Sequence, residues 1–167
     1  PNITKLSVVK TQVPAGNPGG GGMPVSYQVV VTNVGTAMID DLVVVDTVSG
    51  VIVGQASTEP AAFSPPVVTH VAGVGTRYVW SNGSLNMVPG DSYTFGVSGV
   101  IGLVCVPETV GNVVVAVGSG GCSATSARYG LAPFTVQPPI KLSVVKTQAP
   151  ANPGAGEDVL YRIVVRN

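Results

Sequence analysis

The 167-residue sequence is poor in charged side chains, in aromatic side chains and in histidine. Charged residues make up 10% of it, against about a quarter in an average domain, and eight basic residues balance eight acidic ones. A neutral chain offers no basic surface to nucleic acid, so we expect no nucleic-acid partner. The one histidine, His70, cannot build a multi-histidine zinc site, and we expect no metal and no cofactor. No run approaches the roughly 20 apolar residues of a membrane span, so we expect no membrane insertion of this segment.

The residue in excess is valine, with 35 copies, and it is accompanied by 22 glycines and 14 prolines. An apolar content of 45% separates the sequence from charge-rich disordered chains. Valine, glycine, proline and threonine are poor helix formers, and no apolar period of 3.6 residues is sustained. The composition therefore predicts an all-β protein, and we expect no enzyme.

Cysteine usage and glycosylation motifs bear on the compartment. The sequence has two cysteines, Cys105 and Cys122. In a β-rich chain of this composition we expect them to form one disulfide across a strand–turn–strand segment, the alternative being two buried free thiols. Two sequons mark Asn2 and Asn82 as candidate N-glycosylation sites. These features favour an extracellular protein of the cell surface.

An internal repeat gives the strongest signal for domain organisation. Residues 5–33 read KLSVVKTQVPAGNPGGGGMPVSYQVVVTN, and residues 141–167 read KLSVVKTQAPANPGAGEDVLYRIVVRN. The first eight residues are identical, and a two-residue gap in the loop aligns the rest. The sequence therefore predicts one complete unit over residues 1–137. Residues 138–167 are predicted to be a linker and the first two strands of a second unit.

These two strands need partners, because an isolated two-stranded hairpin is only marginally stable in water. Either the chain continues as a tandem array or a neighbouring subunit supplies the partners, so we expect the protein to associate with itself. The expected assembly residues are those of the apolar face: Leu142, Val144, Lys146, Tyr161, Ile163 and Val165.

Alternation of apolar and polar residues predicts the strands of the first unit. They are residues 6–11, 26–33, 42–48, 51–55, 67–71, 77–80, 92–105, 112–117 and 123–129. Lys10 and Asp46 fall on the inward faces of their strands, and Asn112 opens a late strand. Short strands at this spacing predict a two-sheet sandwich with Greek-key connections.

The ordered set of motifs LSVVKT, VSYQVVVTNVG, LVVVDTVSGV, YVWSNGSLNMVPGDSYTFGVSGVI and VGNVVVAV resembles the "conserved repeat domain" of bacterial and archaeal surface proteins. The resemblance covers about residues 5–127 and again 141–167. The matching positions are Tyr27, Asn33, Gly35, Asp46, Trp80, Leu85, Pro89, Gly90 and Asn112. Departures from the pattern are Asn112-Val-Val in place of Asn-x-Ala, a glycine run after Asn17, and the cysteine pair. The resemblance implies an immunoglobulin-like sandwich in tandem arrays, with a stalk, adhesin or sheath role and no enzyme activity.

Lys10 is the most informative residue, because lysine is almost never buried without a partner. Burial lowers the pKa of an amine and makes its neutral form nucleophilic. We therefore hypothesise an isopeptide bond between Lys10 and Asn112, assisted by Asp46. It is similar to the bonds that sandwich domains of Gram-positive adhesins form between a first-strand lysine and a last-strand asparagine. Asn33 is the alternative acceptor. The competing interpretation is that Lys10 extends to water or forms an ordinary ion pair with Asp46.

From the sequence we expect a structural repeat unit of an extracellular filament, stalk or sheath, assembled by tandem repetition or strand exchange. The alternative is an adhesin-type module that recognises a glycan or a host protein.

Overall fold

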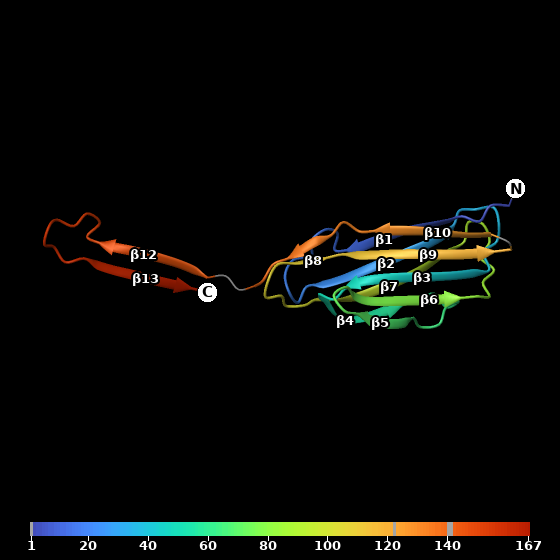
Figure 1. Cartoon of the computed structure of the whole chain (residues 1–167), viewed down its shortest axis with the longest axis horizontal. Helices are drawn as coiled ribbons and strands as arrows, with labels where there is room; N and C mark the ends of the chain where they lie inside the picture. Colours follow the sequence, from blue (N-terminus) through green and yellow to red (C-terminus); the bar gives the residue numbers. More distant parts are fainter. Residues whose placement is uncertain (1, 122, 140–141) are drawn as a thin grey trace.

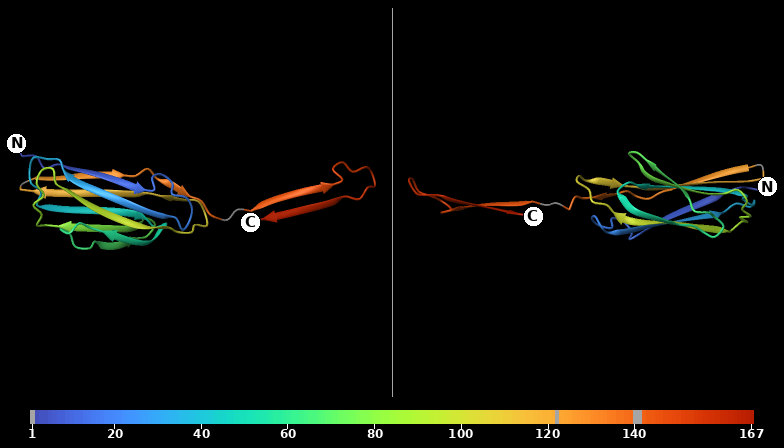
Figure 2. Two further views of the ribbon diagram at one scale, coloured as in Figure 1. Left: turned by 180° about the vertical axis from the view of Figure 1, so that it is seen from behind. Right: turned by 90° about the horizontal axis from the view of Figure 1, so that it is seen from below.

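A computed structural model describes residues 2–121, 123–139 and 142–167. Two antiparallel sheets pack face to face (Figures 1 and 2). The first sheet has the order β1 (Leu6–Val13), β2 (Pro24–Asn33), β7 (Ser92–Ile101), β4 (Ile52–Thr58). The second has the order β10 (Ser123–Gly130), β9 (Asn112–Gly120), β3 (Asp41–Ser49), β6 (Gly75–Asn82), β5 (Val67–Val71). β8 (Glu108–Val110) pairs with β11 (Phe134–Val136), and β12 (Ser143–Ala149) pairs with β13 (Leu160–Arg166).

The chain passes repeatedly between the two sheets. It enters the first sheet at β1 and β2, crosses to β3, returns to β4, crosses to β5 and β6, returns to β7 and crosses again to β9 and β10. Such crossings place strands that are distant in sequence side by side, which is the Greek-key arrangement. The predicted all-β, immunoglobulin-like Greek-key sandwich is confirmed, and β12 and β13 form a separate two-stranded sheet after it. Within the described residues, no helix is long and apolar enough to cross a membrane.

Side chains alternate between the core and the solvent along the central strands, as the period of two requires. In β2 every second residue from Val25 to Asn33 is buried, and in β3 every second residue from Leu42 to Val48. Trp80 is buried in the core, where its ring stacks on that of Tyr78 and packs at a tilt against that of Phe95. The predicted inward faces are therefore the observed ones.

Two details differ from the strand prediction. The long strand, or bent pair of strands, expected over residues 92–105 ends at Ile101, because the next residue, Gly102, turns away and donates its N–H to the Val51 carbonyl at 2.7 Å. The second difference is the small β8–β11 sheet, in which Phe134 and Val136 are buried. Strands of three residues are too short to produce a readable alternation, so the pattern did not reveal them.

The expected disulfide between Cys105 and Cys122 is wrong. Cys105 is a free, exposed thiol in the loop that follows β7, and Cys122 lies outside the described residues. The flanking Gly121 and Ser123 belong to the β9–β10 turn, whereas the Cys105 loop lies at the end where β9 begins. Sequence spacing could not reveal this, because it does not specify at which end of the sandwich each turn falls.

Candidate functional site

The core of the sandwich contains a lysine, an aspartate and an asparagine that converge from three strands. Lys10 comes from β1, Asp46 from β3 and Asn112 from the start of β9, and all three side chains are buried. They are three of the five buried polar or charged residues among the described part of the chain. The structure therefore brings together the three residues for which the sequence predicts cross-linking chemistry.

Strand register explains why Asp46 and Asn112 are neighbours. In the β3–β9 ladder, Asp46 lies opposite Val114, and Asn112 lies two residues earlier on β9. A shift of two residues keeps the side chain on the same face, so the carboxyl and the carboxamide are diagonal neighbours on the inner face of one sheet. Lys10 reaches them from β1 in the other sheet, which packs against β9 and β10.

The Lys10 ammonium contacts one carboxyl oxygen and one aromatic ring. Its Nζ forms an ion pair with Oδ1 of Asp46, and both side chains are fully buried. The Nζ also lies 5.3 Å from the centroid of the Tyr27 ring, within the range of a cation–π contact. Lys10 therefore does not extend to water, and that part of the competing interpretation is wrong.

Burial shifts the pKa values of the pair toward each other. Desolvation lowers the pKa of Lys10 from its ordinary value of 10.5, although the Asp46 carboxylate opposes the change. Desolvation raises the pKa of Asp46 from 3.8, opposed chiefly by Lys10 and also by the neighbouring Asn112 amide. Both shifts favour a neutral pair, an uncharged amine beside a protonated carboxyl. Burial and the Asp46 charge also raise the pKa of Tyr27 to about 12.

Several buried polar atoms at this site make no hydrogen bond of ordinary geometry with the described residues, although the Asn112 amide is near enough to the Asp46 carboxyl to lower its pKa. They are Oδ2 of Asp46, both Nδ2 and Oδ1 of Asn112, and the Tyr27 hydroxyl. Each unsatisfied buried polar group destabilises a fold by about 1–3 kcal/mol, and such groups are rare. Their concentration around one lysine marks this site as chemically unusual rather than as ordinary core.

Asn33, the alternative acceptor, is fully engaged elsewhere. Its Nδ2 donates to the carbonyls of Ala37 and Met87, each at 2.9 Å, and its Oδ1 accepts from the Gly35 N–H at 3.0 Å. It also pairs with Leu6, four residues from Lys10 along β1. The Asn33 carboxamide therefore shapes the turn after β2 and is not available to the lysine.

The remaining predicted residues lie on the surface. Asn2 is exposed, whereas the Asn82 carboxamide at the end of β6 already donates to Ala62 at 2.6 Å and accepts from the Ser84 N–H at 2.8 Å. The six predicted assembly residues are all exposed; Leu142 lies just before β12, and the other five lie on β12 and β13. The described residues contain no group of three potential metal ligands.

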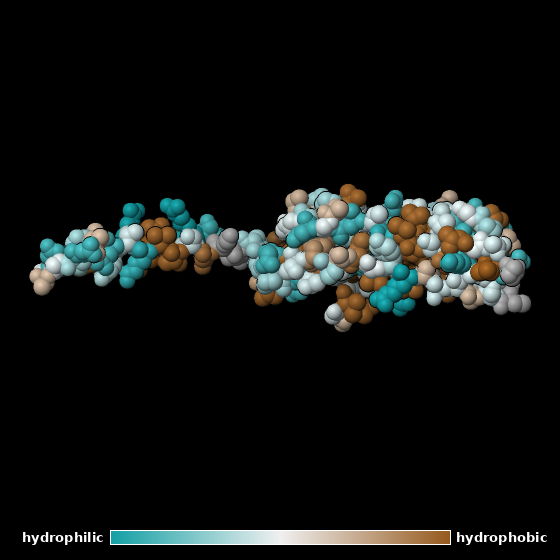
Figure 3. Space-filling model, turned by 90° about the horizontal axis from the view of Figure 1, so that it is seen from above, coloured by the Kyte–Doolittle hydropathy of each residue, from teal (hydrophilic) through white to brown (hydrophobic). Residues whose placement is uncertain are grey.

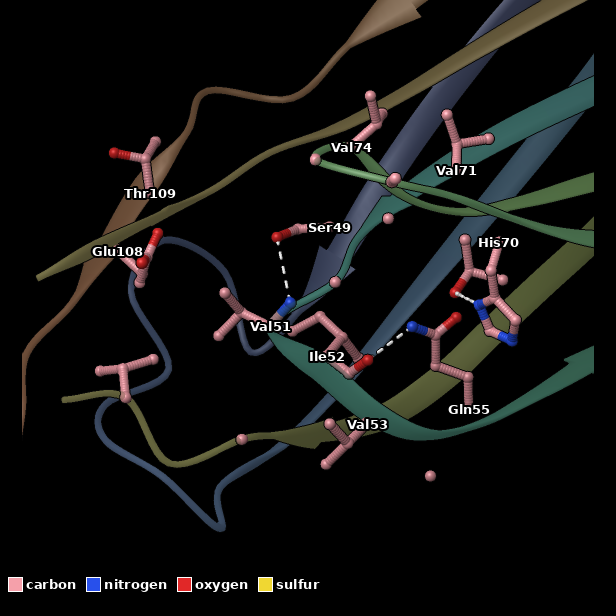
Figure 4. A pocket seen from close by; sticks show the side chains of 18 of the residues that line it. Ser49, Val51, Ile52, Val53, Gln55, His70, Val71, Val74, Glu108 and Thr109 are labelled. Atoms are coloured by element: carbon pink, nitrogen blue, oxygen red, sulfur yellow. Dashed lines mark hydrogen bonds between the residues drawn. The ribbon is translucent and has the colours of Figure 1, made fainter. Parts of the chain in front are cut away.

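An open groove of about 1230 Å³ lies at one end of the sandwich, lined by β4, the β5–β6 hairpin and the loop that follows β7 (Figure 4). Three of its polar side chains already have hydrogen-bond partners. Gln55 donates to the Ile52 carbonyl at 2.5 Å and accepts from the Tyr78 hydroxyl at 2.7 Å. His70, the only histidine, lies 3.1 Å from the Thr76 hydroxyl.

Comparison with known proteins gives similarity at the level of fold. The class that the strand order defines is an immunoglobulin-like β-sandwich. No family model matches the sequence, and no curated protein matches it.

Among solved structures, a variant of BcpA, the major pilin subunit of Bacillus cereus, is 11% identical with a TM-score of 0.51. The match covers 95% of this chain and 53% of the pilin. A DUF4466 family protein from Parabacteroides merdae is 14% identical with a TM-score of 0.47, over 87% of this chain and 49% of that protein. The chain thus spans about half the length of these two proteins, and the likeness to the pilin supports the fold alone.

Proposed function

We propose that the protein is a structural repeat unit of an extracellular filament or stalk on a cell surface. The observation that carries this proposal is the β12–β13 hairpin, which repeats β1–β2 in sequence and leaves its apolar face uncovered (Figure 3). A unit of this kind is built to join a neighbour end to end. The pilin among the structural neighbours and the low charge of the chain agree with such a role.

We further propose that an isopeptide bond between Lys10 and Asn112 locks the sandwich. The neutral Lys10 amine attacks Cγ of Asn112, a C–N bond forms, and the Cγ–Nδ2 bond breaks. The amine gives up one proton to the departing nitrogen, which leaves as ammonia, so no oxidant or cofactor is needed. Asp46 in its protonated form donates a hydrogen bond to Oδ1 of Asn112 and relays the proton. The unpartnered atoms Oδ2 of Asp46 and Oδ1 and Nδ2 of Asn112 are the ones that this reaction uses.

The intact mass of the purified chain tests the bond. We expect a mass lower than that of the sequence by one ammonia molecule, and a branched tryptic peptide that joins Lys10 to Asn112. In single-molecule pulling, the bond should keep the roughly 100 residues between them from extending, which shortens the released contour length by about 350 Å. An unmodified mass together with full extension under force would contradict the bond.

The Asp46→Asn variant should reveal the free buried amine. Without the acid the bond does not form, and Lys10 loses the neighbour that raised its pKa, so only the lowering effect of burial remains. Between this lowered pKa and 10.5, the unfolded chain binds a proton that the folded chain does not. The free energy of unfolding in urea should therefore rise as the pH increases from 7 to 10.

The matched control is the double variant Lys10→Met, Asp46→Asn, which lacks the titrating amine. It should not show this rise, because burial still holds the pKa of the adjacent Tyr27 above its ordinary value of 10, and so above the window. A rise of the same size in both variants would contradict the assignment to Lys10.

The alternative function, an adhesin-type module that recognises a glycan or host protein, stays a prediction. The groove of Figure 4 would be its place, but the polar groups described there are engaged with one another. The structural role has the stronger support.

A further inference from the structure

The two hairpins of the chain have the same strand register. In the first, Lys10 lies opposite Val29, and Gln12 lies opposite Tyr27. In the second, Lys146 lies opposite Ile163, and Gln148 lies opposite Tyr161. These are the equivalent positions of the repeat, so β12–β13 has the pairing of β1–β2 without a sandwich around it.

The same face is buried in one hairpin and exposed in the other. Leu6 is 6% exposed, whereas its counterpart Leu142 is 68% exposed; Val29 is 1% exposed, whereas Ile163 is 62% exposed. In the first unit this face is covered by the second sheet, and β7 pairs with the outer edge of β2. The face and the outer edge of β13 have no such cover among the described residues.

The lysine of the second hairpin is already placed against its tyrosine. Lys146 Nζ lies 4.3 Å from the centroid of the Tyr161 ring, and Lys10 Nζ lies 5.3 Å from that of Tyr27. The hairpin thus contains the counterparts of the Lys10 amine and of the Tyr27 ring. It lacks the acid and the carboxamide, because Asp46 and Asn112 come from β3 and β9, and residues 142–167 contain no such strands.

We propose that β12–β13 is the amine-bearing half of a second cross-linking site, a proposal that rests on the bond proposed for Lys10. Its partner is a sandwich segment of the kind formed by residues 34–139 that carries no first hairpin of its own. Such a segment supplies a β7-type strand for the edge of β13, an aspartate on a β3-type strand and an asparagine on a β9-type strand. Burial of Lys146 against them makes the amine neutral. It then attacks the asparagine Cγ, one C–N bond forms, the Cγ–Nδ2 bond breaks, and one ammonia leaves.

A second complete copy of the chain does not fit this role. Its own β1–β2 already covers the face that the hairpin would occupy. The competing strands are identical over the first eight residues of the repeat, and the resident hairpin is attached in the same chain, at a high effective concentration. The partner must therefore lack the hairpin, as an incomplete neighbouring unit does.

The test extends the full chain by appending a copy of residues 34–139 directly after Asn167, because residue 34 follows the equivalent Asn33 in the first unit. The original chain should lose one ammonia molecule and the extended chain two. In the extended chain, Lys146→Arg should reduce the loss to one, as should Asn112→Ala in the appended copy alone. Lys5→Arg, a change at an exposed lysine, is the matched control and should leave the loss at two.

The outcomes separate the two proposals. Loss of one ammonia by an extended chain whose second tryptophan is shielded from solvent would overturn this inference and leave the Lys10 bond standing. A copy that stays unfolded after Asn167 would overturn it as well, because the proposal holds that this segment completes the hairpin. No loss in either chain would overturn both proposals. Covalent dimers of the original chain, linked through Lys146, would overturn the choice of partner.

Discussion

The Asn112→Ala variant should keep the mass of its sequence and unfold at a temperature on the order of 15 °C below that of the native chain. The bond between Lys10 and Asn112 closes a loop of about 100 residues, and a cross-link of that span removes about 4–5 kcal/mol of chain entropy from the unfolded state. For a domain of this size, each kcal/mol moves the midpoint by roughly 3–4 °C. Calorimetry and intact mass, measured on the same sample, check both effects.

The control for this variant is Asn86→Ala, which removes a carboxamide from an exposed position. It should retain the ammonia loss and should change the free energy of unfolding by about 0.5 kcal/mol or less. If Asn112→Ala and Asn86→Ala unfold at the same temperature, the cross-link has no role in stability.

Single substitutions at Lys10 or Asp46 should be more damaging than the double substitution. Lys10→Met prevents the bond and also leaves the buried Asp46 without its partner. Asp46→Leu likewise prevents the bond and leaves the Lys10 amine alone in the core. Breaking a buried pair from one side destabilises a protein by about 3–5 kcal/mol, whereas replacing both members with apolar residues is often neutral or stabilising. The double variant Lys10→Met, Asp46→Leu should therefore regain about 3–5 kcal/mol relative to either single variant.

Urea unfolding of the four chains, including the native one, gives the coupling between the two positions. The double variant should resemble Asn112→Ala, since both lack the bond and neither contains an unpaired Lys10 or Asp46 side chain. Additive effects of the two single substitutions would show that the buried pair is not coupled in the folded protein.

A charge-poor, valine-rich core suits the proposed chemistry. An amine is nucleophilic at neutral pH only where water is excluded, and a carboxyl can donate a proton only where its ionised form is disfavoured. The apolar side chains around Lys10 and Asp46 produce both effects by desolvation. The low charge and high valine content of the chain thus create the apolar environment that the proposed reaction of Lys10 requires.

Local periodicity was sufficient to predict much of this protein. The period of two assigned Lys10 and Asp46 to inward faces, and the identity of residues 5–12 and 141–148 predicted the second hairpin. Both signals lie within a few neighbouring residues, where alternation of side chains is a property of the single strand. The sequence contained weaker evidence for Asn112 rather than Asn33 as the acceptor, because either residue could be placed on an inward face.

The sequence by itself determined the all-β class, the inward faces, the repeat and the inward position of Lys10, because each depends on the order of neighbouring residues. Only the tertiary structure decided which strands meet. It brought Asn112 beside Asp46 through the β3–β9 register, tied Asn33 into the turn after β2, and left Cys105 as a free thiol at the end of the sandwich where β9 begins. Pairing between strands and packing between sheets depend on contacts across the whole chain, which alternation along a single strand does not encode.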